Sequence, residues 1–219
     1  MIKKFAIFFI SIPKTIFYNF KFFDLKVAIK LPILIAYNCK IKGKKGQIQL
    51  LNTNINRFSI KLGINKGSFN FSEGKKTYIE INDSSYLSFG NDVIISKGSY
   101  ICLNNNSKII FNNRFSCNSN CLFSSQSSII FGEDCMLGWN CIIIDGDGHK
   151  TSKSKENNEI VIGNHVWIGA DCKILKGSTI STGSVVGIGS IVSGKFTQDN
   201  ILITSDKAKE RGRNFKWIR

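Results

Sequence analysis

The hydrophobic pattern repeats every six positions from residue 162 onward. Each hexad opens on a branched aliphatic residue, and the residue four positions later is small. The opening residues are Ile162, Ile168, Ile174, Ile180, Val186 and Val192, and the fifth positions are Val166, Cys172, Ser178, Ser184 and Ser190. An α-helix repeats apolar residues every 3.6 positions and a lone strand every two, so neither element produces this period. The pattern predicts short strands that meet at sharp corners, with aliphatic side chains inside.

The same winding extends upstream with a longer step. Similar segments begin at Phe89, Phe111 and Phe131, about 20 residues apart, whereas Ile162 and Ile180 are 18 positions apart. Three hexads make one turn, so each turn has three faces. We therefore expect an all-β fold, a parallel β-helix of about six triangular coils whose strands stack about 4.8 Å apart. The expected parts are an N-terminal cap at 1–45, the β-helix at 46–200 and a basic C-terminal cap at 201–219.

The amino end allows two interpretations. Residues 5–12 form an apolar run after a basic start, but Pro13 and Lys14 follow where a signal peptide would carry a small-residue cleavage site. The run is also shorter than the roughly 20 residues that span a bilayer. Apolar residues recur at helical spacing among lysines, at Phe5, Phe8, Phe9, Ile12, Ile16 and Phe20. This predicts a helix that either caps the β-helix or makes peripheral contact with an anionic membrane.

Composition narrows the classes of partner and compartment. The chain has 30 Lys and Arg against 15 Asp and Glu, so its net charge of +15 favours an anionic partner. We expect no nucleic acid, because the coils carry neither a known binding motif nor a strip of basic and aromatic residues. The seven cysteines are an odd number, which favours a reducing, cytoplasmic compartment over a disulfide framework.

The repeat also suggests what the cysteines do. Cys121, Cys135, Cys141 and Cys172 occupy the small fifth position of a hexad, which favours packing over a zinc site or a reactive thiol. The chain has two histidines, His149 and His165, which argues against a histidine-rich metal site. We therefore expect no metal.

Residues 145–159 break the period. This segment contains no aliphatic residue, so in a stacked coil it must leave the wall as an extruded loop. It carries His149 directly after an Asp-Gly-Asp-Gly run. A histidine can take a proton from an attacking hydroxyl near neutral pH, and a neighbouring carboxylate can orient it. The alternative is a solvated loop with an incidental histidine.

These motifs carry a resemblance to a known family. The hexads resemble those of the hexapeptide-repeat acyltransferases, which fold as left-handed parallel β-helices. The runs SCNSNC (116–121), FGEDCMLGWN (131–140), DGDGHK (145–150) and VWIGADCKILKGS (166–178) resemble the bacterial surface polysaccharide O-acetyltransferase branch. The runs at 12–23 and 28–35 resemble the leader of some bacterial members. The resemblance covers most of the chain.

The resemblance implies an enzyme. It implies a homotrimer whose active site lies in the cleft between neighbouring protomers. The enzyme would use acetyl-CoA as co-substrate and would act on a sugar hydroxyl of a surface polysaccharide or its lipid-linked precursor. Such an enzyme would be cytoplasmic, including at the inner face of the cytoplasmic membrane. His149 would be the catalytic base, oriented by Asp147 or Asp145. The cofactor-binding positions would be Trp167, Gly169, Gly187, Ser190, Lys207 and Lys209.

Two departures from the family pattern and three alternative functions remain open. The family's usual ending resembles GNPAK, whereas this chain has Ser205-Asp206-Lys207-Ala208-Lys209, so the cap near the cofactor would differ in geometry. Ile188 stands where the family often has a small residue, and it would narrow the channel for the pantetheine arm if it faced that channel. The chain could instead acetylate the amine of a nucleotide-linked amino sugar, or be a non-catalytic scaffold or anion-binding module. A zinc carbonic anhydrase would need three histidines, and the chain has two.

Overall fold

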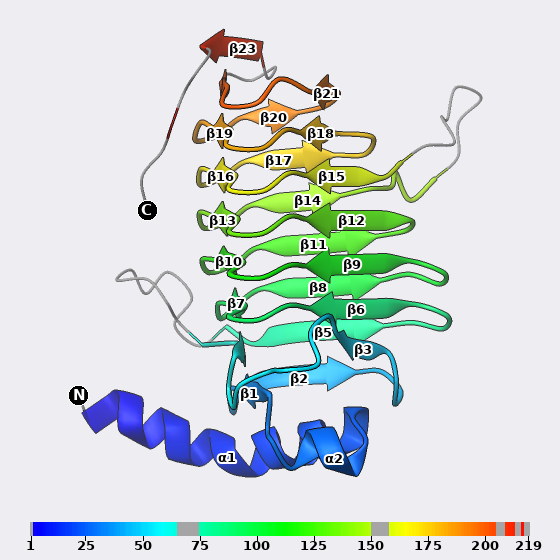
Figure 1. The fold of residues 1–219 in the computed structure, drawn as a ribbon, viewed down its shortest axis with the longest axis vertical. Coiled ribbons are helices and arrows are strands. Elements are labelled where there is room, and N and C mark those ends of the chain that lie inside the picture. Colours follow the sequence, from blue (N-terminus) through cyan, green and yellow to red (C-terminus); the bar gives the residue numbers. More distant parts are fainter. Residues whose placement is uncertain (1, 65–74, 150–157, 205–208, 213–215, 217–219) are drawn as a thin grey trace.

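The computed structural model describes residues 2–64, 75–149, 158–204, 209–212 and 216. Its strands form three sheets that the chain visits in turn, so each coil adds one strand to each sheet. All pairings are parallel except that of the last two strands. Figure 1 shows an elongated prism with two helices across its lower end. The predicted all-β fold, a parallel β-helix with three faces, is confirmed.

The elements have these bounds. The helices are α1 (Ile2–Phe22) and α2 (Leu25–Ala28). The first sheet contains β1 (Ile33–Ile35), β4 (Ile60–Leu62), β7 (Ile94–Ile95), β10 (Ser116–Cys117), β13 (Met136–Leu137), β16 (Trp167–Ile168), β19 (Val185–Val186), β22 (Leu202–Thr204) and β23 (Lys209–Gly212). The second contains β2 (Cys39–Lys42), β5 (Thr77–Ile81), β8 (Tyr100–Leu103), β11 (Leu122–Ser125), β14 (Ile142–Ile144), β17 (Lys173–Leu175) and β20 (Ile191–Val192). The third contains β3 (Ile48–Leu50), β6 (Tyr86–Phe89), β9 (Lys108–Phe111), β12 (Ser128–Phe131), β15 (Ile160–Ile162), β18 (Thr179–Ile180) and β21 (Lys195–Phe196).

The described coils number seven, from β1–β3 to β19–β21, and β22 begins another. This exceeds the expected count of about six. The first coil begins at Ile33, inside the segment expected to be only a cap. The hexad pattern does not show it, because long connections separate the early strands: Ile33 pairs with Ile60, 27 positions away. In the later coils the register is the expected 18, as for Ile162 with Ile180.

The interior of the prism is an apolar column. Phe89, Phe111 and Phe131 stack on successive strands of the third sheet, with ring centroids 5.8 and 5.5 Å apart. Phe115 and Phe123 pack against this stack, and all five side chains are fully buried. In β15 and β18, Ile162 and Ile180 replace the rings, and the partly buried Phe196 follows in β21. Each coil buries its apolar side chains against its neighbours, so the stack is stabilised coil by coil.

The cysteines of the hexads are buried in the wall and bond each coil to the next. Each thiol donates a hydrogen bond of 3.0–3.2 Å to the carbonyl of a glycine on the next coil. The pairs are Cys121 with Gly138, Cys135 with Gly163, Cys141 with Gly169 and Cys172 with Gly187. Burial raises the pKa of Cys135 to about 12 and that of Cys172 to about 11. These thiols stay protonated at neutral pH, so they serve packing and are poor nucleophiles.

The helices close the first coil. α1 lies across the lower end of the prism beside β1 (Figure 1). Of the described helices, none combines the length and the apolar character needed to cross a bilayer.

Candidate functional site

The extruded loop is anchored where it leaves the wall. Asp145 directly follows β14 and is fully buried. Its carboxylate accepts hydrogen bonds from the Ser125 hydroxyl (2.7 Å) and from the backbone N–H groups of Gln126 (2.5 Å) and Ser127 (3.1 Å). These donors form the turn between β11 and β12 on the preceding coil. Asp145 therefore fixes the point at which the chain departs from the β-helix.

His149 lies four residues further along and is exposed. Asp147 forms an ion pair with Lys176. Among the described residues, no hydrogen bond or ion pair joins His149 to Asp145 or Asp147. The structure thus places the three predicted catalytic residues on one short segment without joining them. The rest of the loop, 150–157, lies outside the described residues.

The same edge of the prism carries a polar cavity of about 440 Å³. It follows the turns between the second and third sheets on successive coils. Its lining consists of Ser84, Tyr86, Asn106, Ser107, Lys108, Ser127, Ser128 and Glu159. Glu159 ends the extruded loop and accepts a 2.7 Å hydrogen bond from the Ser128 hydroxyl. The loop therefore leaves and rejoins the wall beside this cavity.

None of the cavity residues was predicted from the sequence. The one signal available was the polar run Ser124–Ser128, which places hydroxyl and amide groups at a corner where the hexads require no more than a small residue. Two further turns, between β5 and β6 and between β8 and β9, complete the lining. Their position below this run follows from the register of the coils and is not visible in a local motif.

The predicted cofactor positions lie on the later coils and in the C-terminal segment, and the structure treats them differently. Trp167, on β16, is 40% exposed, and Ile188, which follows β19, is 70% exposed. Between them, a Cβ added at Gly169 would lie 2.7 Å from the backbone nitrogen of Ile188, so this position requires glycine for the coils to stack. A Cβ added at Gly187 would lie 2.9 Å from the Thr204 side chain.

Ser190 differs from the expectation. Its side chain is fully buried, so it faces the interior of the coil and cannot line a channel at the surface. The physical reason is the hexad itself, whose fifth position is the small inward corner. Lys207 lies outside the described residues, and the backbone of Lys209, in β23, pairs with that of Thr204, in β22.

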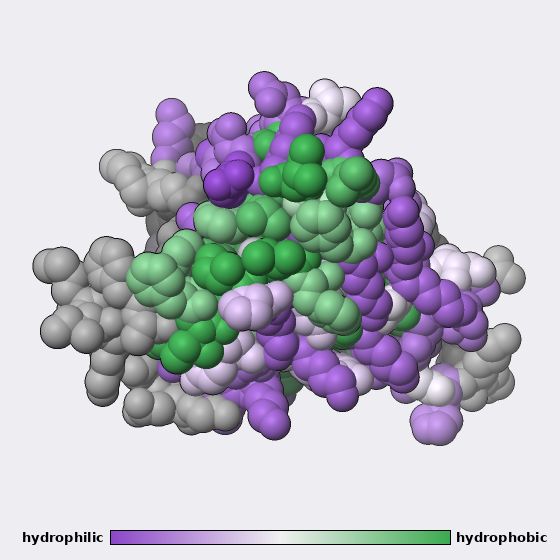
Figure 2. Space-filling model, turned by 90° about the horizontal axis from the view of Figure 1, so that it is seen from below, coloured by the Kyte–Doolittle hydropathy of each residue, from purple (hydrophilic) through white to green (hydrophobic). Residues whose placement is uncertain are grey.

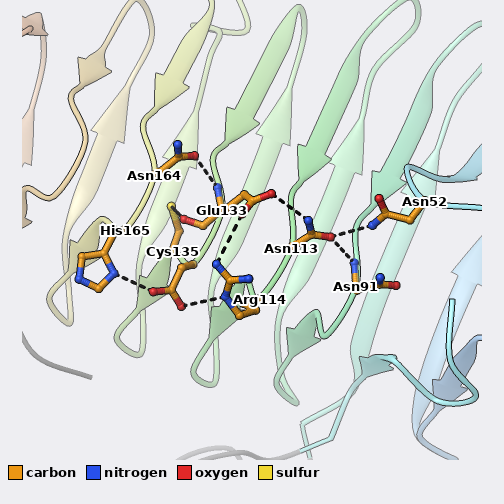
Figure 3. A network of polar contacts seen from close by, with 9 residues as sticks. Asn52, Asn91, Asn113, Arg114, Glu133, Cys135, Asn164 and His165 are labelled. Carbon is orange, nitrogen blue, oxygen red and sulfur yellow. Dashed lines mark hydrogen bonds and ion pairs between the residues drawn. The ribbon is translucent and has the colours of Figure 1, made fainter. Parts of the chain in front are cut away.

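The second histidine belongs to a different environment. His165 Nδ1 lies 2.7 Å from Asp134 Oδ2, and Arg114 Nε lies 3.7 Å from the other carboxylate oxygen of Asp134 (Figure 3). These three residues occupy the same left-handed corner of successive coils, with φ of +53°, +58° and +59°. Such corners favour asparagine, aspartate and glycine, so each position is constrained by the backbone.

The contacts around this corner continue along the prism. The Glu133 carboxylate accepts a 2.9 Å hydrogen bond from the Asn113 amide and forms an ion pair with Arg114 at 3.5 Å (Figure 3). The backbone N–H of Glu133 donates to Asn164 Oδ1. The network joins the corners of successive coils. His165 is thus held by the wall, whereas His149 stands on the extruded loop.

Within the part of the chain that the structure describes, no group of three or more His, Cys, Asp or Glu side chains is arranged to hold a metal ion. His149 is exposed on the extruded loop, and His165 is paired with Asp134 in the wall.

The chain matches no family model and no curated protein sequence. Among solved structures it is similar to PerB from Caulobacter crescentus, solved with CoA and GDP-perosamine, at 20% identity and a TM-score of 0.45, over 57% of this chain and 51% of that chain. It is similar to a maltose O-acetyltransferase from Clostridium difficile 630 at 20% identity and a TM-score of 0.41, over 58% of this chain and 66% of the other. The polySia specific acetyltransferase NeuO shows 21% identity and a TM-score of 0.48, over 83% of this chain and 89% of that chain. This chain thus spans about half the length of PerB, and likeness at this level assigns it no activity.

Proposed function

We propose that this chain is an acetyl-CoA-dependent O-acetyltransferase that modifies a sugar hydroxyl of a bacterial surface polysaccharide or of its lipid-linked precursor. The observation that carries the proposal is the placement of His149. The histidine is exposed on a segment that leaves a rigid wall at a buried anchor, Asp145, beside a polar cavity. Catalytic groups are often carried by loops on such scaffolds. The hexads and the loop motif of the resembled family support the same function.

The proposed reaction is direct transfer. The acceptor hydroxyl gives its proton to His149 as its oxygen attacks the thioester carbonyl. The new C–O bond forms and the C–S bond breaks, and the imidazolium returns its proton to the departing thiolate, so that CoA leaves as a thiol. No cysteine takes part, which agrees with the buried, protonated thiols of the wall.

The two aspartates receive different roles in this proposal. Asp145 is a positioning residue, because its carboxylate is already engaged by three donors of the adjacent turn. Asp147 remains the candidate partner of His149. Its side chain is 44% exposed and pairs with the Lys176 ammonium, which an imidazolium two residues away could replace.

The co-substrate would use a different face of the prism. Trp167 and Ile188 expose apolar surface on either side of Gly169, which suits the pantetheine arm. The basic tail, including Lys207 and Lys209, suits the CoA phosphates. Trp167 belongs to the first sheet, whereas the loop leaves at the corner between the second and third sheets. One chain therefore holds the two surfaces apart, and a homotrimer would bring those of neighbouring protomers together.

The cavity supplies the acceptor surface. Its hydroxyl and amide groups suit sugar hydroxyls, Tyr86 offers a ring for stacking, and Lys108 favours an acidic glycan. The location that fits this substrate is the cytoplasm, at the inner face of the cytoplasmic membrane, where lipid-linked glycans are assembled.

The two histidines provide a matched test. With labelled acetyl-CoA and a bacterial glycan extract, we expect His149→Ala to lower the rate of transfer by about 10²–10⁴-fold. His165→Ala should stay within a few-fold of the wild type, because His165 forms a wall contact that is partly exposed. Label released by mild alkali is an ester, and label that resists it is an amide, which would favour the alternative N-acetyltransferase.

Near-normal transfer by His149→Ala would contradict the assignment of the base. A separate measurement addresses the donor. Binding of acetyl-CoA to the folded protein should raise its melting temperature. The absence of a shift at millimolar acetyl-CoA, together with the absence of transfer, would favour the scaffold function.

A further inference from the structure

Helix α1 binds the β-helix through polar side chains. Ser11, Thr15 and Asn19 recur every four residues, lie on one side of the helix and are buried. The Thr15 hydroxyl accepts from the Ile35 N–H (3.0 Å) and donates to the Ile35 carbonyl (3.2 Å). The Asn19 amide accepts from the Ile33 N–H (3.2 Å) and donates to the Ile33 carbonyl (2.7 Å).

These contacts complete an open sheet edge. β1 is the first strand of its sheet, so its outer N–H and C=O groups have no neighbouring strand. Buried backbone groups without partners are costly, and exposed edges invite pairing with other chains. The Ser11 hydroxyl extends the same pattern by accepting from the Tyr37 N–H at 3.0 Å. The polar side of α1 therefore faces the β-helix, where its side chains form these hydrogen bonds.

The opposite side of the helical end is apolar and exposed. We call it the helical end surface and define it by Phe9, Ile10, Ile16, Phe17, Phe20, Leu25 and Ile29, whose exposure ranges from 43% to 67%. Figure 2 shows a hydrophobic area at this end of the molecule, with hydrophilic residues above it and to its right. A helix that only capped a protein in water would turn its polar side outward. Large exposed apolar areas mark interaction surfaces.

The charge around this surface is strongly positive. Residues 1–46 contain ten lysines and one acidic residue, so they supply nine of the fifteen net positive charges of the chain. Lys26 and Lys30 are exposed, and Lys44, which is also exposed, pairs with Asp83 at 2.6 Å. The acidic residue, Asp24, pairs with Lys45 at 2.7 Å. A second copy of this face would bring like charges together, whereas an anionic lipid surface would satisfy both the apolar side chains and the lysines.

We propose that the helical end surface docks on an anionic membrane. α1 lies in the plane of the interface, its apolar side chains reach the boundary of the acyl chains, and the lysines face the lipid phosphates. The prism then projects away from the bilayer. This contact does not depend on acetyl transfer and would hold for a catalytic or a non-catalytic β-helix.

Vesicle co-sedimentation of the full chain tests the proposal. We expect binding to phosphatidylcholine vesicles that contain phosphatidylglycerol, weaker binding to phosphatidylcholine alone, and weakening of the first by salt. Phe17→Ser should lower the affinity about tenfold, because a large apolar side chain no longer leaves water on binding. The double substitution Lys26→Glu with Lys30→Glu should weaken binding to the anionic vesicles and leave binding to phosphatidylcholine vesicles unchanged. Tyr100→Ser, which removes an exposed aromatic ring from the wall, should leave binding to both kinds of vesicle unchanged.

Three results would overturn the proposal. The first is a wild type that stays in the supernatant with anionic vesicles, and the second is a Phe17→Ser variant that binds them as tightly as the wild type. The third is a mass by light scattering that halves on Phe17→Ser substitution in a protein that does not bind vesicles, because a second copy would then cover the surface. The circular dichroism melting curve of each variant verifies folding, and because activity is not measured, the outcome is separate from that of the proposed function.

Discussion

The wall of the β-helix and its helical end place polar and apolar residues in opposite directions. In the wall, Phe111 is fully buried, whereas at the helical end Phe17 is 61% exposed and Asn19 is 1% exposed. Inside the wall each coil bonds to the coils on both sides, so the interior needs only apolar volume. The first coil has a neighbour on one side, so its outer edge needs hydrogen-bonding side chains. One requirement, that buried backbone groups be paired, thus produces two opposite patterns.

The largest effect is expected inside the wall. Phe111 touches four other rings, those of Phe89, Phe115, Phe123 and Phe131. Phe111→Ala should lower the free energy of unfolding by about 3–5 kcal/mol, because it removes buried apolar volume and leaves a cavity. Urea denaturation measures this value. A loss below about 1 kcal/mol would mean that the coils collapse onto the space, and the wall would then be less rigid than its stacking implies.

A smaller effect is expected at the polar contact of the helical end. Asn19→Leu makes the buried side chain more apolar and similar in volume, yet it should destabilise the protein by about 2 kcal/mol or more. The reason is that the N–H and C=O groups of Ile33 lose their partner. Thr15→Val is the matched variant at Ile35 and should act in the same direction. Unfolding at unchanged or higher denaturant concentration would show that the edge of β1 does not need α1.

The sequence predicted the later coils well because their hexads repeat without long insertions, so the period of 18 residues per coil is visible in the sequence. Ile162 and Ile180 mark the same face at a distance of 18, and the strands pair in that register. The first coil escaped because Ile33 pairs with Ile60 across a long connection that carries no hexads. The sequence left undecided which side of α1 faces the β-helix, because it allowed both a cap and a membrane-contacting helix. Apolar residues at helical spacing normally mark the buried side, but here Phe9, Ile16 and Phe20 are exposed.

The candidate site shows the same division. The absence of aliphatic residues predicts that 145–159 leaves the wall, and His149 is exposed as such a loop requires. The contacts of Asp145 could not be predicted, because they depend on which turn of the preceding coil lies beside it. The burial of Ser190 was predictable in principle, since the fifth position of each hexad faces inward and a ligand reaches only outward positions.

The smallest effect is expected at the exposed side of the helical end. Phe17→Ser should change the free energy of unfolding by no more than about 0.5 kcal/mol, because the ring is largely in water already and the two residues have similar helix propensities. Urea denaturation of the lipid-free protein measures it beside Phe111→Ala, which removes the same type of ring from the wall. A loss above about 2 kcal/mol would mean that Phe17 is covered in solution. Since the described residues leave it exposed, we would then expect another protein molecule to cover it. A negligible loss, combined with weaker vesicle binding, would show that the ring contributes to docking and not to folding.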